Sequence, residues 1–388
     1  MKINRLLSIV AATGSLFAAA PSAIAEDTVK IGMVMPLTGP LAAAGKQVVA
    51  GAKFYMRQHG DMVAGKKLEL IVQDDTTAFD VGRRLIQELI VSEKVNIIAG
   101  GTTGDLLASA ALITEAKKPT VIMLASTSTL IDKSPYFVRT SCTLAQSSAI
   151  VADWAVQQGL AKIVTFVTDF SPGHEAETTF KDRYLAAGGR VIEQVRVPLQ
   201  TIDFTPFLQR ARDANPQAVF AFVPSAQAGA LAKQFAEKGL DKAGIKLIGP
   251  GDITDDELLA NMGDAMLGTT TAHFYSAAHP SPTNKSFVTA FQKDQGVRPN
   301  FMVVSGYDGM HLIYEALRKT NGVTDGDMLT AAMRGTSWES PRGPTSIDQR
   351  GDVVHNIYMR NVEKVGGALY NVEFKTFEAI KNPLVAVH

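Results

Sequence analysis

The sequence predicts an α/β protein built from two doubly wound parallel-sheet lobes. Short apolar runs alternate with longer amphipathic ones, which is the pattern of parallel strands buried between helices. The alternation restarts after Phe137–Arg139, so the chain carries two such series. Even without its first 25 residues, a chain of 388 is too long for one comfortable core and suits two domains.

The first series gives one lobe most of its sheet. Its predicted strands are Val29–Met35, Lys67–Val72, Val95–Ala99 and Thr120–Leu124. The helices predicted between them are Gln47–Arg57, Val81–Glu93 and Asp105–Lys117.

The second series repeats the pattern. Its predicted strands are Ile163–Val167, Arg190–Val197, Ala218–Val223 and Ile245–Gly249. Its predicted helices are Gln146–Gly159, Glu175–Ala187, Pro206–Ala214 and Ala226–Gly239.

The C-terminal part departs from this alternation. Helices are expected first, at Ser286–Gln295, Met302–Lys319 and Asp327–Arg334. Strands follow at Thr345–Ile347, Val353–Arg360 and Tyr370–Phe377. A late helical block followed by strands indicates a return to the first lobe and a second crossing to the other. Near Thr140–Ala145 and Thr271–His273 there is no flexible Gly/Ser run, so we expect short hinges.

The N-terminus predicts export. Lys2 and Arg5 precede an apolar stretch, and Ala23-Ile24-Ala25 supplies the small-x-small pattern of a cleavage site before Glu26. A membrane anchor is the alternative, but the stretch is short and broken by Gly14 and Pro21. We therefore expect a signal peptide over residues 1–25, a periplasmic protein and no stable membrane insertion.

Composition excludes several partner classes. Removing the signal leaves 36 of the 38 basic side chains against 38 acidic ones, so neither nucleic acid nor an anionic membrane is an expected partner. Cys142 is the only cysteine, which rules out an internal disulfide. The apolar fraction of 46% makes stability by core burial feasible.

Two hydroxyl-rich loops follow neighbouring strands of the first series. Gly100–Asp105 opens a helix, where free N–H groups and the Thr102 and Thr103 hydroxyls suit an anion such as a carboxylate. Ordinary helix capping by either threonine is the alternative. The loop of Ala125, Ser126 and Thr127 follows the next strand, so both loops should share one edge of the sheet. A polar surface turn is the alternative for that loop.

The second series ends its strands in comparable loops. Phe170, after the first strand, is expected either to face the cleft between the lobes or to act as a hydrophobic staple. Pro224 and Gly251-Asp252 follow later strands. Asp252 is expected to accept a hydrogen bond from an ammonium or hydroxyl group, although a capping box at Thr254–Glu257 also explains acidic residues there.

Signatures of catalysis are absent from the sequence. It contains no GxSxG, no HExxH and no close cysteine pair, and its seven histidines are scattered. Gly39, Gly45 and Lys46 approach a phosphate-binding loop, but the spacing is one residue too long and Gln47 replaces the Ser/Thr. No catalytic residue, metal ligand or cofactor is predicted.

Together these segments resemble the branched-chain amino-acid-binding (leucine/isoleucine/valine-binding-like) family of ABC-transporter receptors, the type I periplasmic binding proteins. The resemblance covers nearly all of the mature chain and depends on the order and spacing of its pieces. They are Ile31-Gly32, Pro36–Pro40, Asp74-Asp75, Ile97–Gly100, Ala125–Ser128, Gly173, Asp203-Phe204, Gly249-Pro250, Tyr307-Asp308 and Gly351-Asp352.

The resemblance implies that two lobes, joined by three crossovers, close on a ligand in the cleft. It assigns residues 26–143 and 272–354 to lobe 1, and residues 144–271 and 355–388 to lobe 2. It also implies that Thr103 binds the ligand carboxylate, with the loop from Ala125 to Thr127 as partner.

Other positions depart from the amino-acid binders of this family. Pro172 and Pro224 stand where aromatic residues are common, and Ala44 is small where a bulkier residue is usual. Gly251-Asp252 stands where the ammonium-binding glutamate belongs. The donors for a carboxylate are kept and the partner of the ammonium is altered, which favours an aromatic or otherwise apolar carboxylate over a branched-chain amino acid.

The sequence therefore predicts a non-enzymatic, monomeric substrate-binding component of an ABC transporter, delivering a small carboxylate to permease subunits. A periplasmic sensor of the same fold and a secreted α/β hydrolase are the alternatives. The hydrolase would need a nucleophile and a base, for which the sequence offers no arrangement.

Overall fold

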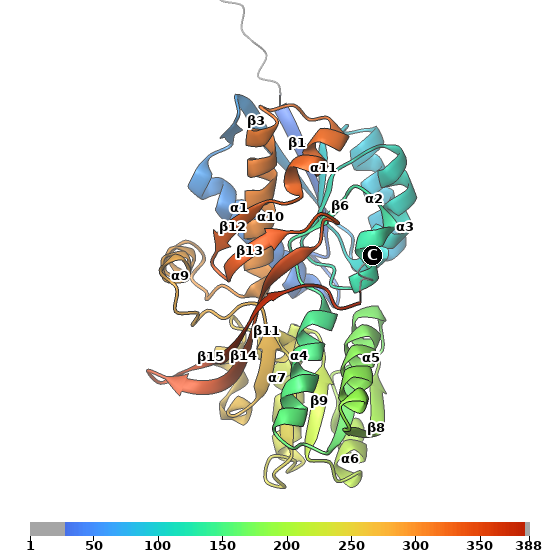
Figure 1. The fold of residues 1–388 in the computed structure, drawn as a ribbon, viewed down its shortest axis with the longest axis vertical. Coiled ribbons are helices and arrows are strands. Elements are labelled where there is room, and N and C mark those ends of the chain that lie inside the picture. The colour runs from blue at the N-terminus through green and yellow to red at the C-terminus, as the bar shows by residue number, and fades with distance from the viewer. Residues whose placement is uncertain (1–27, 385–388) are drawn as a thin grey trace, which may run out of the picture.

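The computed structural model describes residues 28–384, which form two lobes arranged end to end (Figure 1). The expected signal peptide and its cleavage before Glu26 lie outside the described residues. One lobe is built on a six-stranded sheet and the other on a nine-stranded sheet, both mostly parallel. The predicted two-lobed α/β class is confirmed. Within residues 28–384, no helix combines the length and the apolar character needed to cross a membrane.

The lobe-1 sheet has the order β2-β3-β1-β4-β5-β6 and is parallel except for β2. Because β1 lies between β3 and β4, the chain winds first to one side of β1 and then to the other. Ligands of open α/β sheets bind at such a reversal, beyond the carboxyl ends of the strands. The strands are β1 (Thr28–Met35), β2 (Met62–Val63), β3 (Lys66–Asp74), β4 (Ile97–Gly100), β5 (Thr120–Ile122) and β6 (Phe137–Arg139).

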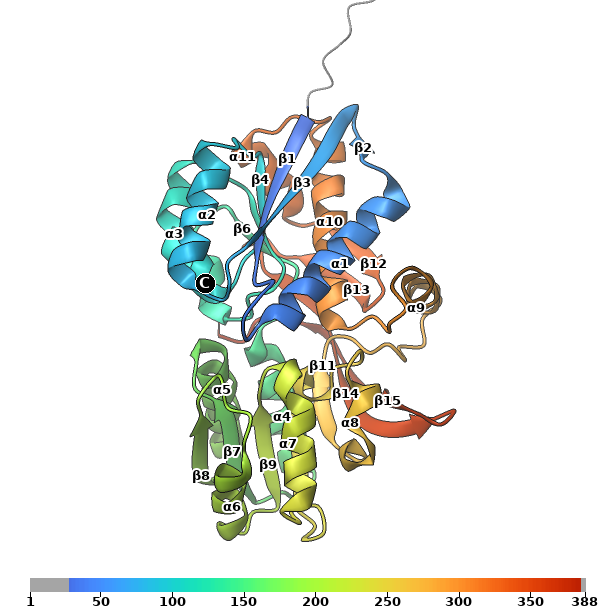
Figure 2. The same cartoon turned by 180° about the vertical axis from the view of Figure 1, so that it is seen from behind.

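Helices cover both faces of this sheet (Figure 2). Ile31 and Met33 of β1 pack towards one group of helices, while Val34 packs towards the other, because successive side chains of a strand alternate. The first group is α1 (Ala42–His59), α10 (Phe301–Lys319) and α11 (Gly326–Met333). The second is α2 (Phe79–Val91), α3 (Thr103–Glu115) and the 3₁₀ turn η1 (Ser128–Lys133).

The lobe-2 sheet repeats the reversal, with β7 between β8 and β9. Its parallel strands are β7 (Lys162–Thr168), β8 (Arg190–Val197), β9 (Ala218–Phe222), β10 (Lys246–Pro250) and β11 (Thr270–His273). Antiparallel strands extend it: β12 (Ser337–Ser340), β13 (Gly343–Ile347), β14 (Val353–Val365) and β15 (Ala368–Ile380).

The helices of lobe 2 also lie on two faces. One core joins α4 and α5 to the sheet, and a second core joins α6 and α7 to its other face. The elements are α4 (Leu144–Gln157), α5 (Ser171–Ala186), α6 (Thr205–Asp213), α7 (Ser225–Glu237), α8 (Leu259–Met262) and the turns η2 (Gly251–Thr254) and η3 (Asp264–Met266). Helix α9 (Pro282–Gln295) packs through Phe287 and Phe291 on Phe54 of α1.

The expected lobe boundaries stay a prediction. The cut between residues 271 and 272 falls within β11, and the cut between 354 and 355 falls within β14. Strands β12 and β13, which the sequence assigns to lobe 1, are joined by hydrogen bonds through β14 to the lobe-2 sheet. Thr271–His273, near which a short hinge is expected, lie in β11, a strand that the sequence did not indicate because its short polar run has no apolar periodicity.

Two glycines bring helices α1 and α5 close to the ends of the strands that precede them, β1 and β7. A Cβ at Gly45 of α1 would lie 1.9 Å from the carbonyl oxygen of Pro36, and one at Gly173 of α5 would lie 1.9 Å from that of Thr168. No side chain fits at either position. The first turns of α1 and α5 therefore start at the edge of the sheets where the two lobes meet.

Candidate ligand-binding site

The two threonines at the start of α3 have different tasks. Thr102 is the N-cap: its hydroxyl donates to Asp105 Oδ2 at 2.7 Å and accepts from the Asp105 N–H at 3.3 Å. The capping interpretation is therefore confirmed for Thr102. Thr103 takes no part in the cap, and its Oγ1 lies 3.1 Å from Oγ1 of Thr127.

Thr127 connects both lobes. Besides Thr103, its hydroxyl lies 3.3 Å from the hydroxyl of Ser171, the first residue of α5 in lobe 2. Thr103 and Thr127 are buried. Hydroxyl groups can turn their protons towards a shared acceptor, and the first N–H groups of α3 and α5 have no partner within their helices. This arrangement suits a carboxylate, which only accepts hydrogen bonds.

Arg139, which no sequence motif indicated, holds the loop of Thr127 in place. This fully buried guanidinium donates to the carbonyl oxygens of Thr127 at 2.9 Å and Ala125 at 3.3 Å, and pairs with Asp352 at 2.9 Å. Asn382 adds bonds to Asp352 at 2.9 Å and to the Ser128 carbonyl oxygen at 3.2 Å. The loop is therefore fixed in shape by buried polar groups.

Ala125 and Ser126, the two predicted partners that precede Thr127, contribute mainly backbone groups. The Ala125 carbonyl oxygen also accepts from the Ser141 hydroxyl at 2.8 Å, and that of Ser126 accepts from the Leu144 N–H at 3.2 Å. Ala125 is buried, whereas Ser126 is half-buried. Their bonds shape the loop and connect it to α4.

Two further hydrogen-bonded groups join the lobes. The N–H and hydroxyl of Ser128 both donate to the Glu175 carboxylate, at 2.7 Å each. Burial raises the pKa of Glu175 despite these bonds. On the other side, the Gln47 amide of α1 donates to Glu257 at 2.7 Å. The lobes therefore touch around their carboxyl-end loops, with Glu175 and Glu257 as contacts that the sequence did not indicate.

An aromatic wall lies on lobe 2. The ring of Phe170, at the N-cap of α5, stacks on Phe222 of β9 with centroids 6.0 Å apart and planes at 19°. Phe170 remains half-buried. Its ring packs on Phe222 of a neighbouring strand, and not on its own helix as a hydrophobic staple would. Pro172 in the first turn of α5 and Pro224 at the N-cap of α7 are also half-buried. Ala44 lies half-buried in the first turn of α1.

Asp252 has a different environment from the one that a capping box would give. Asp255, not Thr254, caps the following turn through the N–H of Glu257 at 2.9 Å, while the Thr254 hydroxyl donates to the Gly251 carbonyl oxygen. The capping-box interpretation is therefore wrong. Asp252 is buried in η2, and its Oδ2 lies 3.9 Å from His273 Nε2. Burial raises the pKa of Asp252 to about 7, and the positive charge of Arg360 opposes this rise only in part.

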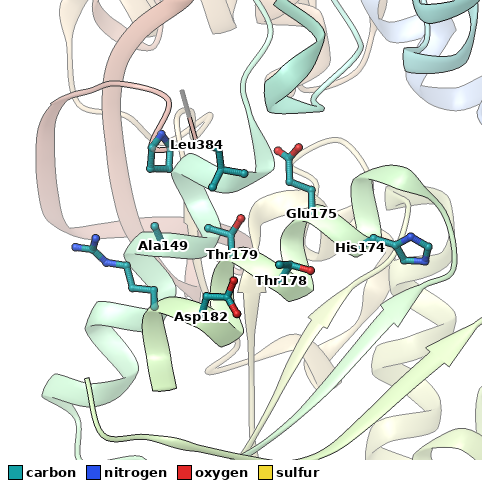
Figure 3. Close-up of a pocket in the computed structure, with 9 residues that line it drawn as sticks. Ala149, His174, Glu175, Thr178, Thr179, Asp182 and Leu384 are labelled. Atoms are coloured by element: carbon teal, nitrogen blue, oxygen red, sulfur yellow. The ribbon is translucent and has the colours of Figure 1, made fainter. Parts of the chain in front are cut away.

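A separate hollow of about 420 Å³ lies along α5, and Ala149 of α4 and the C-terminal Pro383 and Leu384 also line it. Figure 3 shows His174 and Glu175, neighbours on this helix, pointing in different directions. His174 pairs with Asp169 at 2.6 Å, and Glu175 reaches lobe 1. Thr103, Thr127 and Asp252 do not line this hollow.

Known proteins match this chain over most of its length. Residues 28–367 match the family described as periplasmic binding protein. Leu/Ile/Val-binding protein homolog 6 of Brucella abortus is 39% identical over 95% of this chain and 96% of its own length.

Solved structures show the same fold. A solute-binding protein of an ABC transporter from Rhodopseudomonas palustris BisB5, in complex with 3,4-dihydroxybenzoic acid, is 57% identical with a TM-score of 0.90, over 92% of this chain and 99% of that one. A solute-binding protein from strain HaA2, in complex with p-hydroxybenzoic acid, is 39% identical with a TM-score of 0.89, over 93% of this chain and all of that one.

The fold and the match over most of the chain define a receptor-type binding protein rather than an enzyme. This chain belongs to the periplasmic binding protein family. Its family implies a periplasmic location.

Proposed function

We propose that this chain is the solute-binding component of an ABC transporter for aromatic carboxylates. The observation that carries the proposal is the cluster of three hydroxyls from both lobes, Thr103, Thr127 and Ser171, at helix starts. A carboxylate bound there accepts hydrogen bonds from lobe 1 and lobe 2 at once. Ligand binding thereby favours the closed arrangement of the lobes, because only that arrangement supplies both sets of donors.

The aromatic part of the ligand is assigned to the wall of Phe170 and the prolines. Stacked or edge-on aromatic rings gain energy beyond their buried area, and Pro172, Pro224 and Ala44 add apolar surface without bulk. Similar proteins of Rhodopseudomonas palustris are in complex with hydroxybenzoic acids, which supports this assignment.

A branched-chain amino acid is the second candidate, because Asp252 offers a carboxylate to an ammonium group and relatives are named Leu/Ile/Val-binding homologs. We further propose that the mature chain begins at Glu26, remains monomeric, and delivers its ligand to permease subunits. No catalytic step belongs to this function.

Calorimetric titration of ligand-free protein with benzoate and with leucine tests the proposal. Saturable benzoate binding, with recovery of unchanged benzoate, is expected. Tight leucine binding without benzoate binding would overturn the assignment of the ligand class, and a new product after prolonged incubation would overturn the assignment as a binding protein.

A further inference from the structure

We propose that Glu175 is an interlobe latch, a positioning residue that holds the lobes closed through Ser128 and so sets how long a ligand stays bound. The latch acts between the lobes and touches no ligand atom. The inference rests on the proposed function and deepens it, because it assigns control of closure to a side chain outside the hydroxyl cluster of Thr103, Thr127 and Ser171.

Helix α5 presents Glu175 to lobe 1. Glu175 follows Ser171 by four residues, so the two side chains lie on the same face of the helix, one turn apart. The first turn of α5 is held against β7, since a Cβ at Gly173 would lie 1.9 Å from the carbonyl oxygen of Thr168. The direction of the Glu175 side chain, seen in Figure 3, is therefore set within lobe 2.

Lobe 1 holds Ser128 in position to donate. Its carbonyl oxygen accepts from Arg139 at 3.3 Å and from Asn382 at 3.2 Å, and Ser128 is fully buried. The N–H and the hydroxyl of Ser128 then donate to different oxygens of the Glu175 carboxylate, at 2.7 Å each. Short hydrogen bonds to a charged acceptor are about twice as strong as those between neutral groups.

The latch and the hydroxyl cluster share the same two segments. Thr127 and Ser128 are consecutive in the lobe-1 loop, and their partners Ser171 and Glu175 are one turn apart on α5. Closure that forms the Thr127–Ser171 contact therefore forms the Ser128–Glu175 contact too. Both latch bonds join protein atoms directly, so they stabilise the closed arrangement whichever ligand it holds.

Charge keeps the latch separate from the ligand. A carboxylate ligand placed beside Glu175 would meet a like charge, and both oxygens of Glu175 already accept from Ser128. Glu175 also lines the hollow along α5, whereas the three hydroxyls of the cluster do not. Loss of Glu175 should therefore leave every contact with the ligand in place.

Closure enters the affinity as a common factor. A ligand binds more weakly in proportion as the binding-competent arrangement is less populated. Without the latch this population falls, so the affinity for every ligand should fall by the same factor. The contact between Gln47 and Glu257 remains, so closure is weakened and not abolished.

The test measures the affinities for benzoate and 4-hydroxybenzoate by calorimetric titration. In Glu175→Ala we expect both affinities to fall by about tenfold, while their ratio stays within about twofold of the wild-type ratio. Asp182→Ala is the matched control, because this exposed acid lies two turns further along α5 and lines the same hollow. It should keep both wild-type affinities.

Kinetics separate a latch from a general loss of structure. Stopped-flow displacement of bound 4-hydroxybenzoate by excess benzoate should give a dissociation rate about tenfold faster in Glu175→Ala than in wild type. Ser128→Ala removes only the hydroxyl donor and should weaken binding by about threefold. In the Glu175→Ala background it should have no further effect, because the two residues act as one contact.

Unchanged affinity or an unchanged dissociation rate in Glu175→Ala would overturn the inference alone. A changed ratio between the two acids, or additive effects of Ser128→Ala and Glu175→Ala, would overturn it as well. Failure of the wild type to bind either acid would overturn the proposed function, and the inference with it.

Discussion

The buried pair of Arg139 and Asp352 should control both stability and ligand binding. Its atoms are 2.9 Å apart, and the side chains are 0% and 4% exposed. Removing one member of a buried pair typically costs about 3–5 kcal/mol, because the other charge stays in the interior without compensation. Asp352→Asn keeps the shape but removes the charge, so we expect a loss of about 3 kcal/mol in the free energy of unfolding. That is a large share of the roughly 5–15 kcal/mol that stabilises a folded protein.

The same substitution should reach the ligand. Arg139 fixes the carbonyl oxygens of Ala125 and Thr127, so a loosened guanidinium allows the loop to move away from Ser171. We expect benzoate affinity to fall by about tenfold, equivalent to about 1.4 kcal/mol. Urea unfolding followed by circular dichroism measures the first effect, and calorimetry of the folded variant measures the second.

A surface pair supplies the control. Asp132 pairs with Arg350 where both side chains are 37–45% exposed, and exposed pairs contribute about 0–1 kcal/mol. Asp132→Asn should therefore change the stability by less than about 1 kcal/mol and leave benzoate affinity unchanged. Equal effects of Asp352→Asn and Asp132→Asn would refute the role assigned to the buried pair.

Three more perturbations test separate parts of the structure. Thr103→Val should weaken benzoate binding by about 1.5–3 kcal/mol in calorimetry, whereas Thr103→Ser, which keeps the hydroxyl, should not; equal affinities would return Thr103 to a structural role. Gly45→Ala should lower the thermal midpoint, because its Cβ would lie 1.9 Å from a carbonyl oxygen, while Gly229→Ala on α7, with its nearest neighbour at 3.5 Å, should not. Burial, with the nearby acids, raises the pKa of Asp255 to about 7, so the folded protein binds a proton that the unfolded chain has lost, and this group costs stability as the pH rises from about 4 to 7. Asp255→Asn should therefore gain stability relative to wild type between pH 5 and pH 8, by about 2–4 kcal/mol in urea unfolding; parallel pH profiles would contradict the assignment.

The sequence could predict the lobes because their strands are short, continuous apolar runs separated by longer amphipathic helices. It could also predict the hydroxyl-rich loops, since carboxyl ends of parallel strands meet at one edge. The residues alone could not distinguish Thr102 from Thr103, and only the family resemblance indicated Thr103. Only the structure shows that the first is bound in the cap with Asp105 and the second lies beside Thr127.

Residues whose partners lie far away in the chain escaped prediction. Arg139 and Asp352 are buried together although most of the chain separates them. His273 ends a strand too short and polar to be seen in the sequence, and Asp252 reaches it only through the pairing of β10 with β11. Polar residues of this kind carry no periodic signal, because their burial depends on tertiary contacts.

A crystal structure of the mature protein with bound 4-hydroxybenzoate tests the proposed binding site most directly. We expect the carboxylate to lie about 2.7–3.0 Å from the hydroxyls of Thr103 and Thr127, with the ring against Phe170 between the two lobes. A carboxylate bound elsewhere, such as in the hollow beside His174 along α5, would contradict this site.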